Sequence, residues 1–187
     1  MQLETPQPLS TRVREIEKSA RKRALWTPGP STREVRIERE RGVEHLLPHR
    51  DPFLFVDRIT AVDLEQQAIA CERTIAEHDP VFVGHFPGEP MYPGVLQLET
   101  MGQAGICLLA FLARGSVEVP AAPSPLHVRA LRIHGALFLA PVLPGESLEI
   151  LGTLLSRDDY TAVCAGQLRK KGGEIAAFAV MEVYLVE

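Results

Sequence analysis

The chain has 187 residues, of which 45% are hydrophobic and 24% are charged, and its mean hydropathy is +0.01. These values fit one globular domain with a short appendage, and they exclude a collagen-like or low-complexity protein. The cysteines (Cys71, Cys107 and Cys164) are too few and too scattered for a disulfide framework or a zinc site. Because the N-terminus is polar, we expect no secretory signal and a reducing, cytoplasmic location.

The net charge of −4 is the sum of two regions with opposite net charge. Residues 1–41 contain ten Lys/Arg and six Asp/Glu, a balance of +4, whereas residues 42–187 contain ten and eighteen, a balance of −8. A basic arm can bind nucleic acid or a membrane surface. Here, however, acidic residues alternate with the basic ones, and Trp26 is the arm's one aromatic residue. We therefore predict a solvated arm with no nucleic-acid partner.

The first predicted element is an amphipathic helix over residues 11–24, which the Pro- and Gly-containing stretch at residues 26–30 ends. Its apolar face comprises Val13, Ile16, Ala20 and Ala24. The folded domain is expected to begin near Val43. Residues 1–42 are thus predicted to be a basic, partly helical N-terminal extension.

The most apolar segment covers residues 95–113 and predicts a long helix. Its length approaches that of a membrane span. Gln97, Glu99 and Gln103 lie in its first half, however, and polar or charged groups are costly in lipid. We therefore predict the core helix of a globular protein, with no membrane insertion.

Apolar and polar residues alternate before and after this helix, as they do in half-buried strands. The predicted strands cover residues 54–62, 68–75, 147–156, 160–170 and 174–187. Short turns join the last three strands, and Lys-Gly-Gly before the final strand is typical of a tight hairpin. One long helix with an antiparallel sheet is an α+β fold. The sheet must curl around the helix, because no other predicted element is long enough to cover it.

The segment at residues 84–94 contains three prolines and three glycines in eleven residues, the composition of a stiff, shaped loop. It carries His85 and leads into the apolar helix, whose second turn carries Glu99. Gly94 lies at the helix start, where unpaired backbone N–H groups favour negative charge. A base, an acid and an anion-binding helix end are the groups needed to remove a proton next to a carbonyl and hold the resulting enolate.

Residues 84–104 (Gly-His-Phe-Pro-Gly-Glu-Pro-Met-Tyr-Pro-Gly-Val-Leu-Gln-Leu-Glu-Thr-Met-Gly-Gln-Ala) resemble the signature of FabZ-type (3R)-hydroxyacyl-[acyl carrier protein] dehydratases. A second match is Leu-Leu-Pro-His-Arg-Asp-Pro-Phe-Leu-Phe-Val-Asp-Arg-Ile at residues 46–59, and a third is Pro-Val-Leu-Pro-Gly-Glu-Ser-Leu at residues 141–148. The matches follow the family order within residues 43–187 and leave residues 1–42 outside. The resemblance implies the hotdog fold, a long helix wrapped by a curved antiparallel sheet.

The resemblance also implies roles for the matched residues, in fatty-acid or polyketide-like biosynthesis. His85 corresponds to the histidine that removes the C2 proton of the hydroxyacyl thioester. Glu99 corresponds to the glutamate that helps protonate the departing C3 hydroxyl. Gly94 corresponds to the glycine whose N–H binds the thioester carbonyl. The substrate is carried on the phosphopantetheine of acyl carrier protein, and the reaction uses no cofactor and no metal.

The family further implies a homodimer or a trimer of dimers, in which His85 of one subunit meets Glu99 of the partner subunit. Three other loop residues are expected either to line a channel for the acyl or pantetheine chain or to pack in the core: Phe86, Pro87 and Tyr92. His49, in the upstream motif, is expected to fix the loop before the first strand by hydrogen bonding.

One strand departs from the family pattern. The family commonly shows Gly-Ile-Asp-Lys-x-x-Phe-Arg where residues 132–139 read Arg-Ile-His-Gly-Ala-Leu-Phe-Leu, so Gly135 and Leu139 replace the usual Lys and Arg. If those basic residues help to receive an acidic carrier, docking here must differ, and the basic arm is a candidate source of positive charge. Two other functions stay open: a hotdog thioesterase, and a non-catalytic acyl-binding protein that the altered strand would suit.

Overall fold

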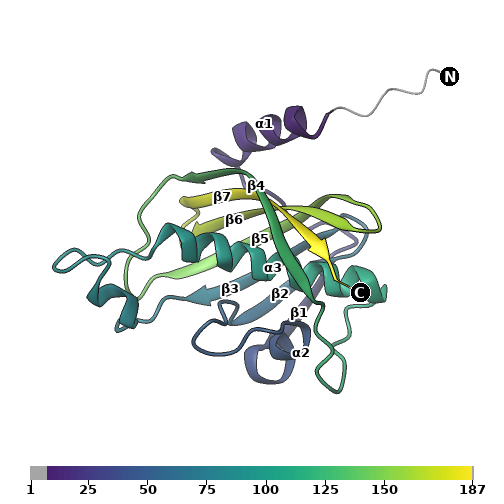
Figure 1. The fold of residues 1–187 in the computed structure, drawn as a ribbon, viewed down its shortest axis with the longest axis horizontal. Helices are drawn as coiled ribbons and strands as arrows, with labels where there is room; N and C mark the ends of the chain where they lie inside the picture. The colour runs from purple at the N-terminus through teal and green to yellow at the C-terminus, as the bar shows by residue number, and fades with distance from the viewer. Residues whose placement is uncertain (1–7, 187) are drawn as a thin grey trace.

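The computed structural model describes residues 8–186 and shows a seven-stranded sheet curved around a long helix (Figure 1). The strands are β1 (Arg33–Glu38), β2 (Arg58–Asp63), β3 (Ala68–Thr74), β4 (Val128–Phe138), β5 (Ser147–Arg157), β6 (Thr161–Lys170) and β7 (Ile175–Leu185). Their order across the sheet is β1-β2-β3-β5-β6-β7-β4, and every neighbouring pair is antiparallel. The predicted α+β fold is confirmed.

The helices are α1 (Leu9–Ala20), α2 (Glu44–Leu46) and α3 (Gly94–Arg114), with a π-helical turn η1 at Arg39–Val43 and a 3₁₀ turn η2 at Pro80–Val83. The strands β5, β6 and β7 match their predicted ranges to within two residues at each end. The strand β2 begins later than predicted. The backbone N–H of Phe55 donates to the side chain of Gln103 instead of to a neighbouring strand.

The helix α3 lies in the concave face of the sheet, where the apolar pattern placed it (Figure 1). By length and composition it could cross a membrane, but 67% of its apolar window is buried inside the fold. It is therefore the predicted core helix. Gly166 on β6 allows the close approach of α3, because a Cβ atom there would lie 2.6 Å from Cβ of Met101.

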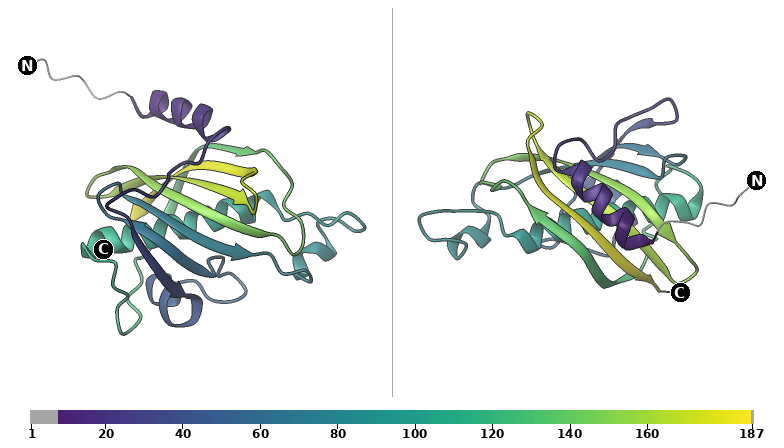
Figure 2. Two further views of the ribbon diagram at one scale, coloured as in Figure 1. Left: turned by 180° about the vertical axis from the view of Figure 1, so that it is seen from behind. Right: turned by 90° about the horizontal axis from the view of Figure 1, so that it is seen from above.

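The N-terminal arm, residues 8–32, lies across the face of the sheet opposite α3 (Figure 2). The helix α1 begins and ends earlier than predicted, at Leu9 and Ala20, and packs Val13 on Phe178 and Val180 of β7. Trp26 covers a second apolar cluster on the same face. Burial of these side chains holds the arm against the sheet.

The boundary of the folded domain differs from the prediction. The strand β1 lies inside the predicted extension, yet it pairs with β2, with Arg33 opposite Val62 and Glu38 opposite Arg58. The sheet therefore begins at Arg33, not near Val43. The sequence of β1, Arg-Glu-Val-Arg-Ile-Glu, has too few apolar residues to distinguish an edge strand from solvated chain, and the pairing with β2 supplies the missing stabilisation.

Candidate active site

Backbone hydrogen bonds fix the loop at residues 84–94. The N–H of Met91 donates to the carbonyl oxygen of His85 at 3.0 Å, which closes the loop on itself. The N–H of Tyr92 donates to the carbonyl oxygen of Val142 at 2.7 Å and ties the loop to the Pro-Val motif. The loop is thus a defined support for the histidine side chain.

The imidazole of His85 has one nitrogen engaged. Its Nδ1 lies 2.8 Å from the carbonyl oxygen of Met91. Since a carbonyl oxygen can only accept, Nδ1 carries the proton and Nε2 of the neutral ring keeps its lone pair. The ring of Phe86 stacks on the imidazole, with 4.0 Å between centroids. Nε2 is therefore available as a base.

The start of α3 lies beside this histidine. Within residues 8–186 no side chain caps the helix at Pro93; the N–H of Leu96 donates to the carbonyl oxygen of Pro93, and the N–H of Gly94 is left for another acceptor. Phe138 of β4 packs on Gly94 so closely that a Cβ atom there would lie 2.9 Å from its ring. Glycine is thus the residue that lets the positive end of the helix reach the cavity wall.

His85 and Gly94 line one cavity of about 420 Å³ with a mainly apolar wall. The other lining residues are Met91, Tyr92, Gln97, Phe138, Leu139, Ala140 and Pro141. Glu99 is not among them. Within one chain, the structure therefore brings two of the three predicted catalytic groups together and places the third elsewhere.

The three predicted channel residues occupy different places. Tyr92 lines the cavity, but its side chain is buried in the core, with its ring 5.4 Å from the guanidinium carbon of Arg73. Phe86 and Pro87 are exposed on the loop and do not line the cavity. Within one chain, Tyr92 is therefore the one of these three residues that lines the cavity.

A buried amide holds the carboxylate of Glu99 in the second turn of α3. Gln103, one helical turn further on, donates from Nε2 to Oε1 of Glu99 at 2.9 Å. The same Nε2 donates to the carbonyl oxygen of Phe53 at 2.9 Å, and Oε1 of Gln103 accepts from the N–H of Phe55 at 2.7 Å. Gln103 thus ties the carboxylate to the upstream motif.

A family model described as a FabA-like domain matches residues 47–178, which include the motif at residues 84–104, all but the first residue of the motif at residues 46–59, and every candidate residue above. The chain belongs to the FabA-like family. It is 44% identical over 108 residues to "3-hydroxyacyl-[acyl-carrier-protein] dehydratase FabZ" of Nitratiruptor sp., covering 57% of this chain and 70% of that protein. It is 41% identical over 147 residues to the protein of the same name from Anaeromyxobacter sp., covering 75% and 90%.

Among solved structures, this FabA-like chain is similar to one in the dehydratase heterocomplex ApeI:P from Xenorhabdus doucetiae. The TM-score is 0.61 at 17% identity, with 80% of this chain and 93% of that chain covered. At that identity the likeness concerns the fold alone. The fold is the hotdog that the motifs implied.

His49 of the FabA-like domain lies where the sequence did not place it. Its Nε2 is 3.4 Å from Oε1 of Glu99, so the imidazole contacts the carboxylate instead of bonding to its own loop. Spacing could have identified Gln103, since residues four apart share one helix face. No local signal links His49 to Glu99, because the fold alone brings the two motifs together.

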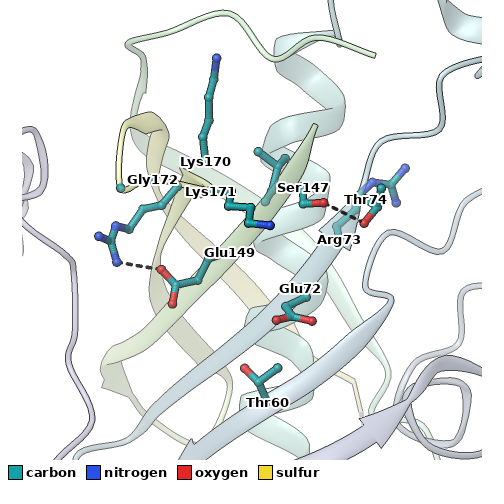
Figure 3. A pocket seen from close by; sticks show the side chains of 12 residues that line it. Thr60, Glu72, Arg73, Thr74, Ser147, Glu149, Lys170, Lys171 and Gly172 are labelled. Carbon is teal, nitrogen blue, oxygen red and sulfur yellow. Dashed lines mark hydrogen bonds and ion pairs between the residues drawn. The ribbon is translucent and has the colours of Figure 1, made fainter. Parts of the chain in front are cut away.

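A larger cavity, of about 510 Å³, lies on the face of the sheet opposite α3 (Figure 3). One charged pair lies within it: Nη1 of Arg169 donates to Oε2 of Glu149 at 2.7 Å. Thr74 and Ser147 share a hydrogen bond of 3.3 Å. None of the candidate residues of the FabA-like site lines this cavity, so we do not place the reaction there.

The cysteines lie in the interior of the fold. Cys71, Cys107 and Cys164 are free and buried, and burial raises the pKa of the Cys164 thiol to about 12. They are therefore structural thiols, not nucleophiles. Among the residues that the structure describes, no group of three or more His, Cys, Asp or Glu side chains is placed to hold a metal ion.

Proposed function

We propose that this FabA-like protein removes water from a (3R)-3-hydroxyacyl thioester to give the trans-2-enoyl thioester, in fatty-acid or polyketide-like biosynthesis. One observation carries the proposal: His85, with Nε2 available as a base, shares a cavity with the uncapped start of α3. The FabZ names of the relatives support the same reaction.

The chemistry follows from the two ends of that cavity. Nε2 of His85 takes the C2 proton, and the electron pair of the C–H bond moves toward the thioester carbonyl. The N–H of Gly94 donates to the carbonyl oxygen and stabilises the enolate. Glu99 of the partner subunit gives its proton to the C3 hydroxyl, which leaves as water while the C2=C3 double bond forms. Return of a proton from the imidazolium to the carboxylate, through solvent, restores both groups.

The separation of Glu99 from the cavity supports a dimer. The strand β4 is at one edge of the sheet, so its outer backbone groups can pair with a second strand. Large exposed apolar side chains lie on β4, just after it and at the start of α3: Leu131, Ile133, Phe138, Leu139 and Val95. We infer a two-fold homodimer through β4 that brings Glu99 of each chain to the cavity of the partner, with a trimer of such dimers as the larger assembly.

Mixed dimers test the reaction and the shared site together. His85→Ala and Glu99→Gln alone should each lower kcat at least about 100-fold, because each removes an acid–base group. When the two variant chains are unfolded and refolded together, each heterodimer contains one intact and one doubly altered site. Activity should then return to about a quarter of that of the wild-type protein, by two-fold symmetry.

The assay measures loss of water from a 3-hydroxybutyryl thioester through the absorbance of the conjugated enoyl product. Unchanged activity in both single variants would overturn the reaction. No recovery on mixing would overturn the shared site, and so would a stable, active monomer in light scattering. Release of free thiol without enoyl product would identify a thioesterase, and tight acyl binding without turnover an acyl-binding protein.

The carrier is proposed to be an acyl carrier protein with a phosphopantetheine-linked substrate. Gly135 stands where the family commonly has Lys, and a Cβ atom there would lie 3.9 Å from Val13 and 3.6 Å from Glu17 of α1. The arm thus covers the altered strand; Glu17 is the charged residue next to Gly135, and the exposed basic residues Arg14, Lys18 and Lys22 lie elsewhere on the arm. We propose that this arm helps to receive the acidic carrier, in the reducing cytoplasm that three free thiols suit.

A further inference from the structure

The carboxylate of Glu99 has two neighbours on the same oxygen. Gln103 donates to Oε1 at 2.9 Å, and Nε2 of His49 lies 3.4 Å from that Oε1. No contact of this kind is formed by Oε2 within the described chain. The two oxygens of one carboxylate therefore have different surroundings.

The amide of Gln103 cannot change its part in this arrangement. It is fully buried, and its carbonyl oxygen is fixed by the N–H of Phe55. Its NH₂ group must therefore point toward Phe53 and Glu99. A carboxylate oxygen in front of a fixed donor is held as an acceptor.

His49 is also held in place. Its side chain is 23% exposed, and its ring stacks on that of Phe53 with 6.3 Å between centroids. Its Nδ1 is buried and has no hydrogen-bond partner in the described chain. Because Nδ1 has no partner, the polar contact of the ring is made by Nε2, with Oε1 of Glu99.

We propose that His49 is a positioning residue for Glu99: with Gln103 it engages Oε1, so that the proton delivered to the substrate is carried on Oε2. The proposal rests on the dehydration described above. Gln103 donates to Oε1 and the imidazole of His49 contacts it, so rotation of the carboxylate would break both contacts and Oε2 is left to face the partner subunit's cavity. A misplaced acid costs turnover more than binding.

Two single variants of His49 and a double-mutant cycle with Glu99→Gln test this proposal. His49→Leu removes the donor at similar volume and should lower kcat on the order of 10-fold with little change in KM. His49→Gln keeps an N–H donor at a similar reach and should restore most of kcat. Adding His49→Leu to Glu99→Gln should have no further effect, because the acid that His49 positions is already gone.

His45→Leu is the matched control. His45 precedes the same motif, and its Nδ1 contacts the carbonyl oxygen of Pro120 at 2.8 Å, away from Glu99. Its loss should lower the melting temperature without lowering kcat. Equal kcat losses in His49→Leu and His49→Gln, or additive losses in the cycle, would reduce His49 to a packing residue. If Glu99→Gln itself leaves kcat unchanged, the dehydration proposal fails instead.

Discussion

Gln103 on α3 and Gln167 on β6 are both fully buried, and each uses both ends of its side-chain amide, but on opposite sides of the sheet. Gln103 binds Glu99 and the upstream motif. Gln167 donates to the carbonyl oxygens of Ala20 and Arg23 at 2.7 and 2.9 Å, and it accepts from the N–H of Leu25 at 2.9 Å. The same chemistry thus orders a candidate acid on one side and attaches the arm on the other.

The two glutamines differ in whether the groups bonded to them can reach water when the side-chain amide is removed. One partner of Gln103, the N–H of Phe55, is buried and cannot reach water without opening the core. The partners of Gln167 belong to a terminal segment that can leave the sheet and hydrate. Loss of one amide should therefore affect the whole domain, and loss of the other a local part of it.

Gln103→Met should have the largest effect. Methionine fills a similar volume but removes the partner of the part-buried carbonyl oxygen of Phe53 and of the buried N–H of Phe55, and loss of the buried bond alone costs about 1–3 kcal/mol. Glu99 also loses its strongest contact, so kcat should fall on the order of 100-fold. Chemical denaturation and steady-state kinetics on one preparation measure both effects. A normal kcat in this variant would show that the carboxylate of Glu99 keeps its position without the hydrogen bond from Gln103.

Gln167→Met is the matched test on the other side. It leaves three backbone groups without their partner, against two in Gln103→Met, but these three can hydrate when the arm detaches. The free energy of unfolding should therefore fall by about 1 kcal/mol or less. Limited proteolysis should cut near Ala24 faster than in the wild-type protein, and kcat should not change. A loss of kcat comparable to that of Gln103→Met would mean that the two faces are coupled.

The elements that sequence predicted well are those whose pattern is local. The helix α3 and the strands β5 to β7 have apolar periodicity within their own residues, so their bounds were predicted closely. The strand β1 has only two apolar residues, and its pairing with β2 cannot be seen in its own sequence. The motifs pointed to His85, Gly94 and Glu99, but the ordering of Glu99 depends on Phe53 and Phe55, which only the fold brings near.

The arm's charge gives the smallest expected effect and the most specific one. Deleting residues 1–40 would also remove β1, so a change in KM would not separate charge from folding. Replacing exposed Arg14, Lys18 and Lys22 by Glu leaves Val13 and Gln167 in place to hold the arm. KM for a carrier-bound substrate should rise about 3- to 10-fold at low salt and less at high salt, because the Debye length shortens.

KM for the same acyl group on free pantetheine should not change, since no carrier docks. If the variant and the wild-type protein have the same KM for the carrier-bound substrate, the arm does not take part in carrier binding and only covers the sheet.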